Sequence, residues 1–500
     1  MSSLQELNTL LESQGLATIS DVDVCPERTE YLSALRSISW SDKGAVAQLN
    51  KLRKAYLLTF HNYLSNVYPH LLFEYGEDKV YFDYDTERGV YVEVNFSVVR
   101  GYIIKMLIDD GMSLDATEVN AKAILARYRA QYPKRGVRYN DFDLDDNWFH
   151  ASNGWVNLVT LEYEPHTPER ISRIKSAVAY DVDALCPTYD RFLDNDLRLK
   201  ADQVRVIDQF SGLCLTNDIR YQKMLTLLGR PGCGKSTLLN CWSDVLGDTA
   251  IERKLTELQG ESMRFAGSSF MGARLCWFDE VDVKKAEMGN TLGTLITGNT
   301  FNVERKGVTG IIKARNTLKC VLTANKLPMN AEVGIYRRLI MINIDGSFVE
   351  DGTVLVDMPD RLRAEDSGIL NRMIRGLQDL RKMRGFTMIA GHDDLIEEYK
   401  AQSDTIAEFL DTYFEVGTED DFIETEVLLA SYRHFAEGNS WTRTITPQKF
   451  GRMLATQPLT RFAKIAPKRT NQSRGWTRIR VKEPYELNIH TKIIEARSNF

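Results

Sequence analysis

The chain of 500 residues lacks several features that would place it in a class at once. It has no run of 18 uninterrupted apolar residues, which excludes a conventional transmembrane helix, and its first residues, MSSLQELNTLL, do not resemble a secretory signal. It also has no internal repeat and no low-complexity tract. We therefore expect a protein without a membrane partner, located in the cytoplasm, or in the host-cell cytoplasm if it is viral.

Zinc-ligand and disulfide patterns are missing as well. The seven cysteines are scattered without C-x-x-C or His/Cys ligand spacing, which argues against a structural zinc site or a disulfide framework. A net charge of −6 excludes a chain that is basic throughout, although local basic patches remain compatible with it. At ~100–200 residues per domain, the length predicts roughly three or four domains.

The stretch LTLLGRPGCGKSTLL, residues 225–239, contains the clearest chemical motif. A short apolar run typical of a buried strand is followed by G-x-x-x-x-G-K-[ST], the phosphate-binding loop, and then by an amphipathic helix. In such a loop the backbone N–H groups and the helix N-terminus face the phosphates. The motif predicts binding of ATP with Mg²⁺ by Gly229, Pro231, Gly232, Cys233, Gly234, Lys235, Ser236 and Thr237, with Ser236 also a metal ligand.

Two later strands are predicted to end in polar residues. RLCWFDE, residues 274–280, ends in Asp279 and Glu280, an acidic pair suited to ordering Mg²⁺ and polarising the attacking water. LKCVLTAN, residues 318–325, ends in Asn325, which can hold that water near a γ-phosphate. Taken alone, an Asn after a strand is more often a turn residue.

A pair of arginines, Arg337 and Arg338, precedes the apolar run LIMINI. Such a pair can be a solvated edge, but its position after the Asn-bearing strand favours an arginine finger that reaches a neighbouring subunit's nucleotide. The active site would then lie at a subunit interface, which predicts a ring.

Two basic segments are candidates for nucleic-acid contact. Residues 295–319 predict a hairpin with Lys306 near its tip and with Arg305, Lys313 and Arg315 nearby, and inside a ring it could hold a DNA or RNA backbone by charge. Residues 461–482 hold eight Lys or Arg and no acid. In this second segment we expect Lys468, Arg469, Arg474 and Arg478 to contact phosphates and Trp476 to act as an aromatic anchor.

The N-terminal region is predicted to be helical up to about residue 60, then to form strands with a turn at Glu87-Arg88-Gly89, then to be helical from about 98 to 132. Asp83 and Asp85 would lie on one strand face, as does the D-x-D metal pair of archaeal-type primases. The alternative is the polar face of a hairpin, which we favour because no partner His and third acid follow at useful spacing.

The ordered motifs GRPGCGKST, RLCWFDE, TGNTFNVERKG, VLTANKLP and YRRLI resemble those of superfamily 3 helicases. They are most similar to the phage and plasmid primase-helicase branch that includes the poxvirus uncoating-factor ATPase. NGWVNLVTLEYEPHTPE, YDVDALCPTYDRFL and FGRMLATQPLTRFAKIAPKRTNQSRGWTRIRV extend the resemblance over about residues 150–482. The branch often has Asn where this chain has Cys233, a position that we expect to contribute backbone only. A full primase domain has no room here.

The resemblance implies a role for each matching position: Lys235 and Ser236 hold nucleotide and Mg²⁺, Asp279 is a metal ligand, Glu280 the catalytic base, Asn325 the sensor, Arg338 the finger and Lys306 the DNA-tracking tip. It also implies a homo-hexameric DNA helicase travelling 3′ to 5′, with single-stranded DNA in its pore, duplex DNA at its C-terminal domain, and a separate primase and polymerase as partners.

The expected fold is α/β, an AAA+ type P-loop ATPase core with a mixed N-terminal region and a winged-helix-like C-terminal domain. The predicted divisions are 1–150, a helical collar or linker at 151–222, the ATPase at 223–395, and the DNA-binding domain at 396–500. Two alternatives remain open: a nucleic-acid-stimulated switch ATPase that assembles without separating strands, and an enzyme of primer synthesis that uses Asp83 and Asp85.

Overall fold

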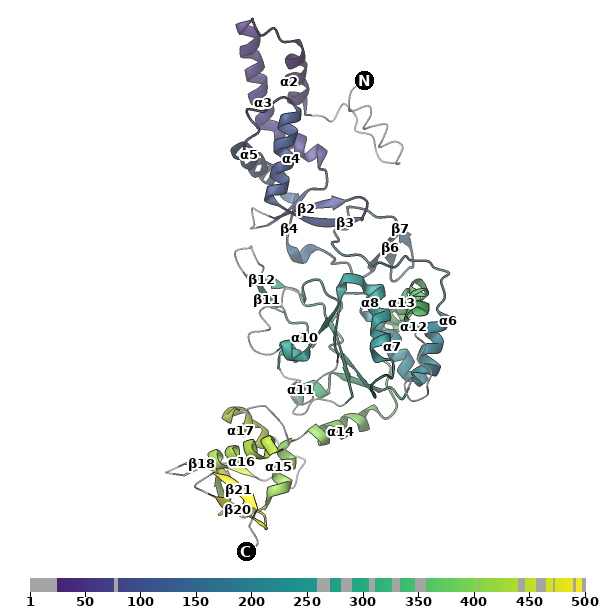
Figure 1. Cartoon of the computed structure of the whole chain (residues 1–500), viewed down its shortest axis with the longest axis vertical. Coiled ribbons are helices and arrows are strands. Elements are labelled where there is room, and N and C mark those ends of the chain that lie inside the picture. The colour runs from purple at the N-terminus through teal and green to yellow at the C-terminus, as the bar shows by residue number, and fades with distance from the viewer. Residues whose placement is uncertain are drawn as a thin grey trace. The chain divides into compact units, whose positions relative to one another are not determined.

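The structure is a computed structural model, and contacts within it divide the chain into two compact units (Figure 1). The first unit comprises Met1–Leu144 and Glu164–Lys175, and the second comprises Asp145–Tyr163 and Ser176–Phe500. The structure describes residues 25–75, 80–258, 270–279, 290–304, 311–325, 333–346, 357–403, 405–438, 446–455, 465–470, 473–488 and 492–496.

The first unit combines helices with a small sheet. The strand order is β3-β2-β1-β4, and one apolar core joins this sheet to the helices. The helical stretch predicted at 98–132 is two helices, because Gly111 takes a positive φ of 75° after the first and the Thr117 side chain caps the second. The elements are α2 (Pro26–Ser37), α3 (Lys43–Val67), β1 (Leu72–Glu74), β2 (Val80–Asp85), β3 (Val90–Asn95), α4 (Phe96–Asp109), α5 (Glu118–Gln131) and β4 (Gly136–Val137).

The hairpin expected around residues 87–89 is confirmed. Strands β2 and β3 pair antiparallel from Val80 opposite Asn95 to Asp85 opposite Val90. Gly89, at a φ of 71°, provides the left-handed turn conformation.

The second unit is built around a parallel five-stranded sheet. Its order is β14-β8-β13-β10-β9, so the strand before the phosphate loop is flanked by the two strands that occur last in the sequence. All four pairings are parallel, so the strands' carboxyl ends share one edge. The strands are β8 (Met224–Leu228), β9 (Ala250–Arg253), β10 (Leu275–Phe278), β13 (Lys319–Ala324) and β14 (Leu339–Asn343).

Both faces of this sheet are covered, as the continuous apolar strand sequences require. Leu225, Leu227 and Val321 pack with one set of helices, whereas Met224 and Leu322 face the other set. Figure 1 shows α7, α8 and α13 on one side of the sheet and α10 on the other. The helices are α6 (Pro187–Arg191), α7 (Ala201–Leu213), α8 (Lys235–Leu246), α10 (Asn290–Ile296), α11 (Val333–Tyr336), α12 (Met358–Arg363), α13 (Asp366–Met383) and α14 (His392–Ser403).

The stretch 151–222 is not a separate helical collar or linker. The hairpin of β5 (Trp148–Ala151) and β6 (Gly154–Asn157) leads into it. Apart from Glu164–Lys175, which belongs to the first unit, it contributes buried apolar residues such as Val178 and Phe210 to one core with the parallel sheet. Helices α7 and α13 approach so closely that a Cβ on Gly212 would lie 2.2 Å from the Met373 carbonyl oxygen, and one on Gly376 would lie 2.0 Å from that of Asp208. The sequence pattern could not reveal this packing because the two helices lie far apart in the chain.

The residues from Thr405 onward have a core of their own. Where the structure describes them, they form the order α15-β15-β16-α16-α17, followed by five short strands. The central sheet has the order β16-β18-β17 and is antiparallel. The elements are α15 (Thr405–Tyr413), β15 (Phe414–Val416), β16 (Phe422–Glu424), α16 (Thr425–Gly438), α17 (Pro447–Ala455), β17 (Ala466–Arg469), β18 (Arg474–Thr477), β19 (Ile479–Val481), β20 (Tyr485–Asn488) and β21 (Ile493–Ala496).

Candidate nucleotide-binding site

The loop between β8 and α8 has the conformation that its glycines predict. Gly232 and Gly234 take positive φ values of 74° and 94°, and Gly234 is the residue before the first turn of α8. Gly229 permits close packing, since a Cβ there would lie 2.6 Å from Cys233 Sγ and 2.7 Å from the Ile344 carbonyl oxygen. These glycines allow the backbone to curl ahead of the N-terminus of α8, where N–H groups have no intrahelical acceptor.

Lys235 occupies the centre of this loop. Its side chain is buried, and its Nζ donates to the carbonyl oxygens of Gly229 at 2.7 Å and Arg230 at 2.9 Å. Asn325 Oδ1 accepts from the same ammonium group at 3.4 Å. The Lys235 ammonium group therefore lies in the loop next to the end of β13. A cation in this position can pair with the phosphates of a nucleotide.

Cys233 contributes more than its backbone, contrary to the sequence-based expectation. Its side chain is fully buried, and Sγ lies 3.4 Å from Lys235 Nζ. A substitution at this position would therefore alter the packing beneath the loop. Among the other predicted loop residues, Thr237 is half-buried and Pro231 is exposed.

Asp279, at the end of β10, meets the first turn of α8. Ser236 Oγ donates to its Oδ2 at 3.2 Å, and the Thr323 hydroxyl donates to its Oδ1. A carboxylate and a hydroxyl at this spacing are hard oxygen donors that fit Mg²⁺, which takes few protein ligands and keeps several waters. Thr323 is a site residue that sequence reasoning missed, although its place two residues before Asn325 on the same strand was a usable signal.

Of the predicted catalytic residues Asn325 and Glu280, the structure describes only the first. Asn325 immediately follows β13 and is exposed beside Lys235. Glu280 lies outside the described residues, immediately after Asp279.

Arg337 and Arg338 lie at the opposite edge of the sheet from the phosphate loop. They join α11 to β14, and the Arg338 carbonyl accepts from Met224 N, at the start of β8, at 2.8 Å. A five-residue strand spans about 16 Å, which separates these arginines from the loop of their own chain. Arg338 Nη1 donates to the Gly334 carbonyl, and the Arg337 side chain is exposed.

The predicted basic hairpin is present in the described residues on both sides of its tip. Strands β11 (Phe301–Glu304) and β12 (Ile311–Ala314) pair antiparallel, with Phe301 opposite Ala314. Lys313 and Arg315 are exposed. The predicted tip residues Arg305 and Lys306 lie outside the described residues.

The basic C-terminal residues do not all face solvent. Lys468, Arg469 and Arg474 are exposed on the hairpin of β17 and β18. Arg478 is paired with Glu419. Trp476 is only 5% exposed and packs in the core of this region, so its ring cannot stack on a base in this fold, contrary to its expected role as an anchor.

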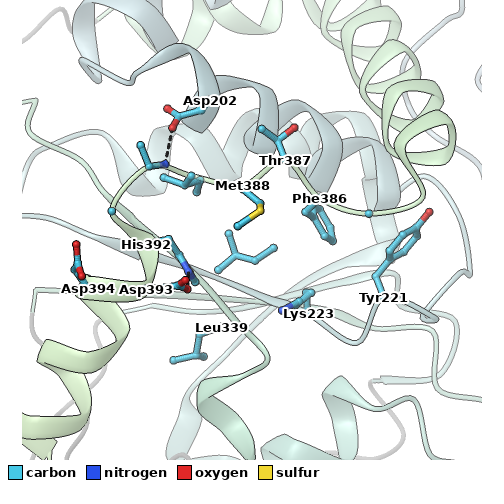
Figure 2. A pocket seen from close by; sticks show the side chains of 15 residues that line it. Asp202, Tyr221, Lys223, Leu339, Phe386, Thr387, Met388, His392, Asp393 and Asp394 are labelled. Carbon is cyan, nitrogen blue, oxygen red and sulfur yellow. Dashed lines mark hydrogen bonds and ion pairs between the residues drawn. The ribbon is translucent and has the colours of Figure 1, made fainter.

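A cavity of about 760 Å³ lies at the amino ends of β8 and β14, away from the phosphate loop (Figure 2). Lys223, Leu339, Phe386, Met388 and His392 are among its lining residues, and the connection between α13 and α14 forms one wall. Ala390 N donates to Asp202 at 2.8 Å and holds that connection in place. Because parallel α/β sheets bind nucleotides at their carboxyl ends, this cavity is not the candidate site.

Asp83 and Asp85 lie on β2, where burial raises the pKa of Asp83. His150, the nearest His candidate in the sequence, is buried with its ring stacked on Trp155 at 3.9 Å. Within the described ranges, no group of three or more His, Cys, Asp or Glu side chains is arranged to hold a metal. No helix in that part of the chain combines the length and apolarity of a membrane span.

Comparisons with known proteins match two segments of the chain. Residues 75–196 match the family described as D5 N terminal like, and residues 227–338 match a family of unknown function, DUF5906. This order of segments is that of phage and viral primase-helicases. No curated protein matches the chain.

Solved structures of one protein also match. Two apo structures of the NrS-1 C-terminal region are 12% and 13% identical, each over 81% of this chain and 94% of theirs, with TM-scores of 0.46 and 0.47.

Proposed function

We propose that this protein is an ATP-driven DNA helicase of superfamily 3 type that works as a homo-hexameric ring in the replication of a phage, plasmid or related element. The observation that carries the proposal is the meeting of Lys235, Ser236, Asp279 and Asn325 at the carboxyl edge of the parallel sheet. Three separate segments of an NTPase motif set, the phosphate loop, the end of β10 and the end of β13, converge there, which a chance Gly-rich turn would not produce.

The strand order supports an AAA+ type core. Strand β13 lies between the loop strand β8 and the acidic strand β10, which puts Asn325 between the Lys235 ammonium and the Asp279 carboxylate. A polar side chain in that position can orient a water toward a γ-phosphate.

Each side chain has a part in hydrolysis. Lys235 neutralises phosphate charge, and Ser236 and Asp279 hold the Mg²⁺ that offsets the developing charge on the transferred group. Glu280, next to Asp279 in sequence, accepts a proton from the attacking water. Asn325 orients that water toward the γ-phosphate.

The position of the arginines supports a shared active site. Arg338 is separated from the loop of its own chain by the length of β8, about 16 Å, which exceeds the reach of one side chain. An arginine at this edge can complete a nucleotide site only in another subunit, as it would in a ring.

Two features support DNA as the polymer on which the ring acts. The hairpin of β11 and β12 carries exposed Lys313 and is followed by exposed Arg315. In the C-terminal region, the order α15-β15-β16-α16-α17-β17-β18 supports a winged-helix-like module, whose β17–β18 hairpin presents Lys468, Arg469 and Arg474.

The test is strand displacement on forked DNA with either a 3′ or a 5′ tail, with ATP and Mg²⁺, comparing wild type with Glu280→Gln. We expect the wild type to unwind the fork with the 3′ tail and the Glu280→Gln variant to lose this activity. DNA-stimulated hydrolysis without opening of either fork would reject the helicase and favour a switch ATPase.

A further inference from the structure

We propose that the surface around Tyr75 in the first unit is a contact site for single-stranded nucleic acid. We define this Tyr75 surface as Tyr75, Arg129, Lys134 and Arg138. It does not depend on the proposed ATP-driven function, because it lies in the first unit and its test requires no nucleotide.

The Tyr75 ring is held rigidly while remaining open to solvent. Its side chain is 51% exposed, yet its hydroxyl donates to the Pro133 carbonyl oxygen at 2.7 Å. One side of the ring rests on β4, where a Cβ on Gly136 would lie 2.5 Å from Tyr75 Cζ. A fixed aromatic ring with a solvent-facing side loses little entropy when a base stacks on it.

The segment that holds this ring is rich in basic residues. Residues 127–138, RYRAQYPKRGVR, contain five Lys or Arg and no acid. Tyr75 N donates to the carbonyl oxygen of Val137 at 2.9 Å, so the Tyr75 backbone lies beside the residue that precedes Arg138. Lys134 and Arg138 are exposed.

The partly exposed Arg129 adds a cation beside the ring system. Its guanidinium carbon lies 4.8 Å from the centre of the Phe73 ring, and Phe73 in turn packs edge-on to Tyr75 at 6.0 Å. Arg129 Nη2 also donates to the Glu74 carbonyl oxygen at 3.3 Å. These contacts fix the guanidinium at one end of the Tyr75 surface.

This chemistry favours single strands over duplex. Duplex DNA exposes phosphates but keeps its bases stacked inside, so it would use the cations and leave the Tyr75 ring without a partner. A single strand offers both phosphates and open base faces, which match a basic surface with an aromatic platform.

The experiment is fluorescence anisotropy with a labelled 20-nucleotide single strand and the full chain, without ATP, over a range of salt concentrations. We expect Lys134→Glu/Arg138→Glu to weaken binding at least about tenfold and to reduce the slope of log affinity against log salt by up to about 1.4. Tyr75→Ala should weaken binding by about tenfold, whereas Tyr75→Phe, which keeps the ring, should stay close to wild type.

The matched control is Lys51→Glu/Lys54→Glu, which makes the same charge change at two exposed lysines of α3 in the same unit. Melting temperatures identify variants that fail to fold. Wild-type affinity and salt slope in a folded Lys134→Glu/Arg138→Glu variant would overturn the proposal. An equal loss of affinity in the control would also overturn it. The same holds if Lys134→Glu/Arg138→Glu weakens binding to duplex DNA as much as binding to the single strand.

Discussion

Ser236 Oγ lies 3.2 Å from Asp279 Oδ2 across 43 residues of sequence. The contact joins the first turn of α8 to the end of β10, at the edge of the sheet where Lys235 also lies. Thr323 holds the other oxygen of the same carboxylate, so Asp279 is fixed from two directions. A carboxylate held in this way is pre-organised for one position of a metal ion.

Replacement of Asp279 by Asn should therefore impair hydrolysis more than nucleotide binding. The amide keeps the shape of the side chain, and it can accept from one of the two hydroxyls and donate to the other, but it loses the negative charge that Mg²⁺ requires. We expect kcat for ATP to fall at least about 100-fold and the Mg²⁺ dependence to shift to higher concentration. The control is Asp360→Asn, whose carboxylate is 83% exposed in a surface pair with Arg363. Unchanged kcat in Asp279→Asn would reject the metal assignment.

Mixing of two inactive variants tests the shared active site. Arg338→Ala removes the proposed finger but keeps the proposed water-activating acid, and Glu280→Gln does the reverse. In an equal mixture, about one interface in four would combine both intact residues, so ATPase activity should reappear. The measurement is steady-state hydrolysis of each variant alone and of the mixture. Arg337→Ala is the control, because its exposed neighbouring side chain should be dispensable. Activity of Arg338→Ala alone equal to wild type would exclude the finger.

The close approach of α7 and α13 predicts opposite effects of one substitution at two helical glycines. Ala is favoured over Gly within helices by about 1 kcal/mol. At Gly376 the added Cβ meets the Asp208 carbonyl oxygen at 2.0 Å, so we expect destabilisation of about 1–3 kcal/mol from overpacking. At Gly101 in α4, no atom lies within 4 Å of the added Cβ, so Ala should raise the melting temperature. The measurement is the melting temperature of both variants by calorimetry. A higher melting temperature for Gly376→Ala than for wild type would contradict the close packing of α7 and α13.

Lys319 should make stability depend on pH. Its side chain is buried, and burial lowers its pKa to about 7. Its Nζ donates to the carbonyl oxygens of Thr216 and Thr317. Because the folded pKa lies below the unfolded value, the unfolded chain binds more protons between about pH 7 and 10. Stability from this group therefore rises with pH across that window, by at most about 1.4 kcal/mol per pH unit, and is lost on acidification toward pH 7.

The measurement for Lys319 is the free energy of unfolding of wild type and Lys319→Met at several pH values. The difference between the two proteins isolates the contribution of this lysine from that of other titrating groups. We expect wild type to lose stability relative to the variant as pH falls from 10 to 7. A difference that is constant with pH would show that Lys319 is equally protonated in both states.

Local sequence determined the elements that carry the chemistry. The motif of this loop could be identified because its glycines, lysine and serine lie within one strand-to-helix turn, and in the structure Gly232 and Gly234 take positive φ values that allow the turn. The β2–β3 and β11–β12 hairpins were also predictable, because turn residues and strand residues lie next to one another in the chain.

Tertiary structure decided which side chains face one another and which face water. Asp279 acquired Thr323 as a partner because parallel pairing brings the ends of β10 and β13 together. Trp476 looked like an exposed anchor among basic residues, but the other elements of its region bury it. Helix α7, within the predicted collar, became part of the layer that covers the parallel sheet, because Gly212 and Gly376 let α7 contact α13. A sequence specifies local conformation through neighbouring residues, whereas burial depends on segments far away in the chain, and only the folded structure reveals those partners.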